Sequence, residues 1–181
     1  MDKFCPRCGA RLEWQDVRGK RRLVCPNGDY VNWSHERISV GGIVKKGKQV
    51  LLVQRAEDPG KGMWMIPGGF VEQDETIATA IQREIKEEAG INTRLGAIRL
   101  LTELPGARWH DIYVVFTLDY LSGKLKQQRE EVQALKFCTV DEALRLPLAD
   151  LTRQILSHCS SKHFKRLPIW PAAANGFYLY G

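Results

Sequence analysis

The chain has 181 residues, of which 44% are hydrophobic and 27% charged, with a net charge of +6 at pH 7. This length supports one main hydrophobic core, and this composition excludes a disordered or fibrous protein. No apolar run approaches the roughly 20 residues needed to span a bilayer, so no membrane partner is expected. The first ten residues contain cysteines but no apolar signal core, which favours a cytoplasmic location.

The N-terminal segment has the cysteine spacing of a small metal-binding ribbon. Cys5 and Cys8 flank a turn that ends in glycine, and a second turn begins at Cys25. Short strands are expected at residues 11–14 and 21–24. The chain's cysteine total of five is odd, which argues against a disulfide framework in a protein without a signal sequence.

The second turn lacks its expected metal ligand. Structural zinc takes four ligands, and Gly28 stands where a fourth cysteine is expected. Asp29 or His35 could replace that cysteine, or the ribbon could hold no metal. Zn²⁺ therefore remains a candidate cofactor of an incomplete site, and we expect it to be weakly held or absent.

The middle of the chain alternates strand and helix patterns. A hairpin is predicted around Gly47, because two apolar runs flank that glycine. The predicted strands are residues 38–44, 49–55, 93–104, 111–120 and 131–140, and the predicted helices are residues 74–90, 141–144 and 148–159. Strands interleaved with helices favour a layered α/β fold.

The predicted helix over residues 74–90 is amphipathic. Asp74 is a plausible N-cap, and Gly90 lies where the helix should stop. Ile77, Ile81 and Ile85 recur every four residues and form one apolar face. Residues 67–69, Pro-Gly-Gly, predict a turn before the helix.

Three carboxylates lie beside this apolar face. Glu84, Glu87 and Glu88 fall within an arc of roughly 100°. A solvated acidic face is one interpretation, with Arg83 and Glu87 paired at i, i+4. A divalent cation is the other, because Mg²⁺ is held by a few carboxylates together with substrate phosphates.

The spacing from Gly69 to Ile91 resembles the complete Nudix box. Five residues separate Gly69 from Glu75, and seven separate Glu75 from Arg83-Glu84-Ile85; Glu87-Glu88 and Gly90-Ile91 follow, each after one residue. This resemblance implies a Nudix α/β/α sandwich with a mixed sheet. The N-terminal ribbon is similar to that of NADH pyrophosphatase-like and ADP-ribose pyrophosphatase members. The expected domains are a ribbon at residues 1–36, a Nudix domain at 37–160 and a tail at 161–181.

The resemblance also implies the chemistry of the site. A Nudix pyrophosphohydrolase, a hydrolase acting on acid anhydrides, uses Mg²⁺ or Mn²⁺ held by Glu84, Glu87, Glu88 and the Gly69 carbonyl. A later carboxylate completes such sites, and Glu131 is the candidate, with Glu130 as the alternative. Arg83 is expected to orient a glutamate, and Glu75 to stabilise the junction of loop and helix. The general base is not assigned.

The substrate is less well defined than the reaction. Pro105 resembles the downstream proline of ADP-ribose pyrophosphatases, whereas the proline-rich run of NADH-hydrolysing members is missing. The resemblance therefore favours an ADP-ribose-like substrate, with Arg55 and Trp109 as further candidate contacts. NADH, FAD and dinucleoside polyphosphates remain alternatives.

A nucleic-acid-binding or RNA 5′-end-processing protein is the alternative from another functional class. It is disfavoured because the basic residues are scattered and no stripe of aromatic and basic residues is evident. The expected partner is a small nucleotide, and a homodimer is left open. The basic and aromatic tail is expected to pack on the domain or on a partner.

Overall fold

The computed structural model describes residues 3–33, 36–106, 110–158 and 178–180. By its internal contacts the chain separates into two compact units, one made mainly of residues 1–36 and the other mainly of the rest. Each unit is described by itself.

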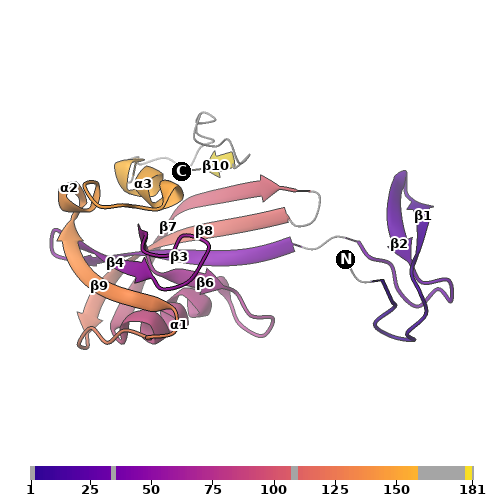
Figure 1. Ribbon diagram of the computed structural model, residues 1–181, viewed down its shortest axis with the longest axis horizontal. Coiled ribbons are helices and arrows are strands. Elements are labelled where there is room, and N and C mark those ends of the chain that lie inside the picture. The colour runs from indigo at the N-terminus through magenta and orange to yellow at the C-terminus, as the bar shows by residue number, and fades with distance from the viewer. Residues whose placement is uncertain (1–2, 34–35, 107–109, 159–177, 181) are drawn as a thin grey trace. The chain divides into compact units, whose positions relative to one another are not determined.

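The order of elements follows the predicted alternation of strands and helices (Figure 1). The elements are β1 (Glu13–Val17), β2 (Lys20–Val24), β3 (Glu36–Lys46), β4 (Gln49–Arg55), β5 (Trp64–Met65), β6 (Gly68–Phe70), α1 (Ile77–Ala89), β7 (Asn92–Pro105), β8 (His110–Ser122), β9 (Val132–Thr139), α2 (Val140–Ala143), α3 (Asp150–His158) and β10 (Tyr178–Tyr180).

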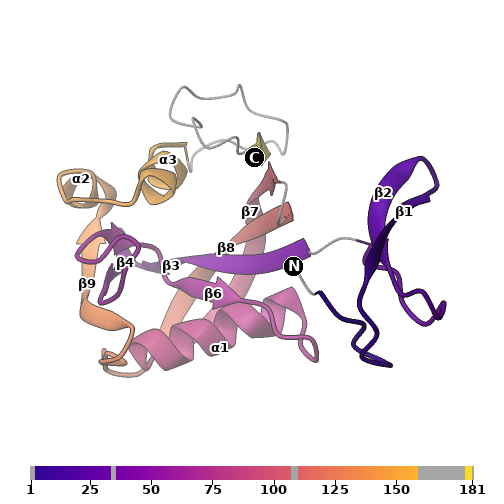
Figure 2. The ribbon, with the colours of Figure 1, turned by 45° about the vertical axis from the view of Figure 1, so that its right-hand side comes forward.

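The larger unit is built on one mixed sheet. The strand order is β10-β7-β8-β3-β4-β5, with β6 paired to β3 and β9 paired to β4. The pairs β3–β4, β3–β6 and β4–β9 are antiparallel, whereas β8 runs in the same direction as β3 (Figure 1). Helix α1 covers one face, and α2 and α3 lie on the other (Figure 2). The predicted α/β/α sandwich is confirmed.

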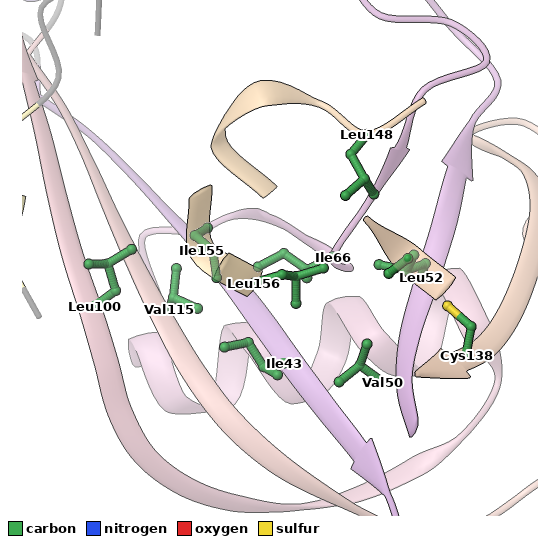
Figure 3. Packing of buried hydrophobic residues seen from close by; sticks show 11 residues of the cluster. Ile43, Val50, Leu52, Ile66, Leu100, Val115, Cys138, Leu148, Ile155 and Leu156 are labelled. Atoms are coloured by element: carbon green, nitrogen blue, oxygen red, sulfur yellow. The ribbon is translucent and has the colours of Figure 1, made fainter. Parts of the chain in front are cut away.

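Both faces of the sheet are buried, which explains why its strands are nearly continuous apolar runs. Val115 packs under α3, whereas its neighbours Val114 and Phe116 pack under α1. Successive side chains of a strand point to opposite faces, so both neighbours need an apolar partner. Figure 3 shows the cluster on the α3 side, where Val115 lies among Ile43, Leu100 and the helix residues.

The predicted N-cap of the helix and the predicted turn before the helix are both wrong. Thr76, not Asp74, caps α1, because the Thr76 hydroxyl accepts the Thr79 N–H at 3.1 Å. Residues 68–70 form the short strand β6 in place of a turn, since Gly68 and Gly69 pair with Gly41 and Val40 of β3. The predicted stop at Gly90 is confirmed, because Gly90 adopts the left-handed conformation with φ 73°.

The smaller unit is a two-stranded hairpin with a cysteine turn at each side. Strands β1 and β2 pair antiparallel, with Glu13 opposite Val24 at one end and Val17 opposite Lys20 at the other. Three arginines lie over tryptophan rings of this unit, Arg21 over Trp14 and both Arg18 and Arg22 over Trp33. The sequence showed no such grouping of basic and aromatic residues, because these contacts join positions up to 15 apart.

The end of the chain returns to the sheet. Strand β10 pairs antiparallel with β7, with Leu179 opposite Thr102. Most of the predicted tail, and Cys159 at the predicted end of α3, lie outside the described residues. Within the described parts of the chain, no helix has the length and apolar character that crossing a bilayer requires.

Candidate active site

Helix α1 presents its carboxylates at the edge of its buried face. Ile81 and Ile85 are fully buried against the sheet, which fixes the rotation of the helix. Glu88 is one turn beyond Glu84 and is only 8% exposed, whereas 51% of the Glu87 side chain is exposed. The three carboxylates of the predicted acidic face therefore differ in exposure: Glu88 is buried, Glu84 is half-buried and Glu87 is exposed.

Strand β6 brings the two box glycines against these carboxylates. The Gly68 N–H donates to Glu88 Oε2 at 3.0 Å. A Cβ added at Gly69 would lie 2.4 Å from Glu84 Oε1. Glycine at position 69 therefore leaves the space in which the Glu84 carboxylate lies.

Arg83 ties the preceding loop to the helix. Its guanidinium donates to Glu75 Oε1 at 2.6 Å, and to Glu84 Oε1 and Glu87 Oε2 at 2.9 Å each. It also donates to the Phe70 carbonyl at 3.1 Å. Glu75 in turn accepts the Glu72 N–H at 2.9 Å. These contacts occupy the guanidinium with protein groups, in keeping with an orienting role for Arg83 and a junction role for Glu75.

The carboxylates have perturbed acidities because burial and like charges reinforce one another. Burial, with the charges of Glu84 and Glu131, raises the pKa of Glu88 to about 8, although the Gly68 N–H opposes this shift. Burial also raises the pKa of Glu84, against the effect of Arg83. The hydrogen bonds from Arg83 lower the pKa of Glu75. Like charges held together in this way would be stabilised by a cation.

Of the two later carboxylates, Glu131 is the one that acts on this cluster. Its charge raises the pKa of both Glu84 and Glu88. Its backbone carbonyl accepts the Ala56 N–H at 2.9 Å, which joins the turn before β9 to the end of β4. Arg55, the last residue of β4, lowers the pKa of Glu88 by its charge. The Arg55 Nε atom is buried and has no hydrogen-bond partner among the described residues.

Of the two remaining predicted substrate contacts, the structure describes only Pro105. Pro105 is the exposed last residue of β7, and no described contact joins it to the glutamates. Trp109 lies outside the described residues.

Two features of the site were missed from sequence. The Gly68 N–H was not expected to bind Glu88, because the two groups meet only when β6 and α1 pack together. The second is the hydroxyl of the partly buried Tyr113, which fills the space that a side chain at position 41 would need. Burial, and then the charge of Glu88, raise the pKa of Tyr113. The paired glycines at 41 and 42 are the sequence signal that could have indicated such close contacts.

A second group of ligand-type residues lies in the smaller unit. The sulfur atoms of Cys5, Cys8 and Cys25 are all within 4.8 Å of one another, an arrangement that could hold a metal ion. Within the described residues, this is the only group of three or more candidate ligands as close as that. The carboxylates of α1 are more widely spread, since Arg83 lies between Glu84 and Glu87.

Comparison with known sequences supports one family. The profile described as NUDIX domain matches residues 35–159. An ADP-ribose pyrophosphatase of Methanocaldococcus jannaschii is 39% identical over 99 residues, which are 54% of this chain and 59% of that protein. The NAD-capped RNA hydrolase NudC of Haemophilus influenzae is 29% identical over 169 residues, which are 89% of this chain and 62% of that protein. The chain thus spans about three-fifths of the length of these relatives.

Comparison with solved structures agrees. A NUDIX hydrolase from Nitrosomonas europaea superposes with a TM-score of 0.72 at 23% identity, over 86% of this chain and 91% of that one, which shows the fold alone. A bifunctional NMN adenylyltransferase/ADP ribose pyrophosphatase from Francisella tularensis, complexed with AMP and a Mn ion, has a TM-score of 0.55 at 26% identity, over 71% of this chain and 43% of that one. With the box in place on α1 and the profile matched over most of the chain, the protein belongs to the Nudix family.

Proposed function

We propose that this protein hydrolyses a nucleoside diphosphate linked to a second moiety, cleaving the diphosphate with the help of Mg²⁺ or Mn²⁺. The observation that carries the proposal is the buried Glu88 carboxylate, held by the Gly68 N–H beside the like charges of Glu84 and Glu131. Buried acidic groups of one sign require a compensating charge, and hard oxygen donors suit these two cations.

Different residues of the site would bind the cation, orient its ligands and contact the substrate. Glu84, Glu87 and Glu88 would hold the cation, with the Gly69 carbonyl and Glu131 completing the donor set. When bound, the cation would neutralise the diphosphate oxygens and lower the pKa of a coordinated water. Arg83 keeps Glu84 and Glu87 oriented through its hydrogen bonds. Arg55, with its buried Nε unpartnered among the described residues, would donate to a phosphate oxygen of the substrate.

ADP-ribose is the preferred substrate class. Support comes from the 39% identity to the ADP-ribose pyrophosphatase, which covers 54% of this chain, and from Pro105. A second candidate is a NAD-type substrate, including NAD-capped RNA. Support for it comes from the match to NudC over 89% of this chain and from the exposed Arg21 and Trp14 of the smaller unit, which are in cation–π contact.

A substrate panel distinguishes the two candidates. We expect ADP-ribose to have the highest kcat/KM, with AMP and ribose 5-phosphate as products, because a site that hydrogen-bonds ribose hydroxyls discriminates strongly against analogues without them. The panel should include NADH, FAD, diadenosine tetraphosphate, 8-oxo-dGTP, 5′-triphosphate RNA and NAD-capped RNA, each with Mg²⁺ and with Mn²⁺. A tenfold or greater preference for NADH or NAD-capped RNA would select the second candidate. The same preference for 8-oxo-dGTP or 5′-triphosphate RNA would reject both.

Gly69→Ala tests the close approach of β6 to Glu84. We expect activity to fall on the order of tenfold to a hundredfold, because the added methyl group would displace the Glu84 carboxylate and small displacements of catalytic groups are costly. The measurement is kcat with the preferred substrate, beside a thermal melt. Phe70→Ala is the matched control, since that side chain is on the same strand and is 57% exposed. Equal activities of the two variants would contradict the proposed geometry.

A further inference from the structure

The cysteine turns of the smaller unit bring a carboxylate to the thiols. Cys8 Sγ lies 3.4 Å from Cys25 Sγ, and Asp29 Oδ2 lies 4.0 Å from Cys25 Sγ. Cys5 and Cys25 are buried, at 3% and 1% exposure. Three thiols from two separate turns therefore meet at one point, and the Asp29 carboxylate lies beside one of them.

These distances fit the edges of one coordination tetrahedron. Zinc bonds to sulfur are about 2.3 Å long and those to carboxylate oxygen about 2.0 Å, so tetrahedral geometry places two sulfurs roughly 3.8 Å apart and sulfur and oxygen roughly 3.5 Å apart. The observed separations of 3.4 and 4.0 Å lie within about half an ångström of those values. These two separations are thus compatible with a zinc ion shared by Cys8, Cys25 and Asp29, and Cys5 Sγ lies within 4.8 Å of both sulfurs.

The second turn is shaped to present residue 29 and not residue 28. Gly28 has φ +80°, in the left-handed region that a cysteine rarely adopts, and its N–H donates to the Cys25 carbonyl at 2.9 Å. No other atom occupies the space beside Gly28, since a Cβ added there would meet nothing within 4 Å. The next residue, Asp29, is the one whose carboxylate lies near the Cys25 thiol.

Further N–H groups of the unit point at the sulfurs. The Arg7 N–H donates to Cys5 Sγ at 3.4 Å, and Asn27 Nδ2 donates to Cys8 Sγ at 3.5 Å. Donors of this kind orient metal-bound thiolates and stabilise their charge. The two turns therefore supply hydrogen-bond donors to the sulfurs as well as the sulfurs themselves.

We propose that Asp29 is the fourth ligand of a tetrahedral zinc site formed with Cys5, Cys8 and Cys25. The glycine at position 28 made a weak or metal-free ribbon the expectation from sequence; the folded turn changes that expectation by moving the ligand one residue along. The site is independent of the proposed hydrolysis.

Zinc content and affinity test this assignment in the full-length protein. We expect one zinc per chain by elemental analysis after purification without chelator. Competition with a chromophoric chelator should show that Asp29→Ala weakens zinc binding by at least about tenfold, because even groups that only orient a ligand contribute roughly 10–100-fold. Cys8→Ser should weaken binding as well. Glu13→Ala, which removes another exposed carboxylate from the same unit, should leave the affinity unchanged.

Cobalt substitution identifies the ligands directly and covers the case in which Asp29→Ala disturbs the fold. Replacing the carboxylate by a thiolate in Asp29→Cys should keep metal binding and increase the thiolate-to-cobalt charge-transfer absorption relative to the parent. The proposal is overturned if the parent binds no zinc when zinc is supplied in excess. It is also overturned if Asp29→Ala binds zinc as tightly as the parent, or if His35→Ala is the variant that loses the metal and Asp29→Ala is not.

Discussion

Glu88→Gln should lower kcat by roughly 100-fold or more without unfolding the protein. The substitution keeps the shape of the side chain and an oxygen that can accept the Gly68 N–H, but it removes the charge that would bind the cation. The measurement is kcat at saturating Mg²⁺ and Mn²⁺ with the preferred substrate. Glu72→Gln is the matched control, because that glutamate is exposed and lies outside the predicted ligand set. Near-normal turnover of Glu88→Gln would reject the assignment of the site.

The stability of the same variant separates lost chemistry from lost structure. In the metal-free protein, the pKa of Glu88 is raised from its ordinary 4.5 to about 8. The neutral carboxyl therefore favours the folded state: its contribution is complete below about pH 4.5 and is lost as the pH rises through 8. We expect metal-free Glu88→Gln to gain in thermal stability relative to the parent as the pH increases across this window. A loss of stability at pH 8 would mean that its low activity reflects misfolding.

Ile85→Ala should lower the free energy of unfolding by about 2–5 kcal/mol. Ile85 is fully buried and packs directly on Gly42 of β3, where an added Cβ would lie 2.8 Å from Ile85 Cδ1. Truncation would leave a cavity between α1 and the sheet that a glycine cannot fill. The change is measured by chemical denaturation followed through a signal of the larger unit.

Ile98→Ala is the control for this change, because Ile98 is on β7 and is 45% exposed. It should alter the free energy of unfolding by no more than about 0.5 kcal/mol. If Ile85→Ala cost no more than this control, the packing of α1 on β3 would be misplaced. Reduced activity of folded Ile85→Ala is also expected, since this residue fixes the rotation of the helix that carries Glu84 and Glu88.

The two glycine-rich stretches show where pattern reading was incomplete. Residues 67–69 were interpreted as a turn, because glycine and proline interrupt helices and strands alike. In the fold, Gly68 and Gly69 instead form a strand that the absence of side chains allows to lie close to β3 and α1. Gly41 and Gly42 likewise accommodate Tyr113 and Ile85. Such close contacts are properties of pairs of segments, which one segment's composition does not reveal.

Local sequence determined the features that depend on neighbouring residues. The four-residue recurrence of isoleucines set the buried face of α1, and the box spacing placed the carboxylates of Glu84 and Glu88 one turn apart on that helix. The tertiary structure alone decided that Glu88 is the buried carboxylate, that its oxygen accepts the Gly68 N–H, and that the thiols of two separate turns meet in the smaller unit. The reason is physical: acidity and metal coordination depend on burial and on distances between atoms far apart in the chain, and these arise only when the segments pack together.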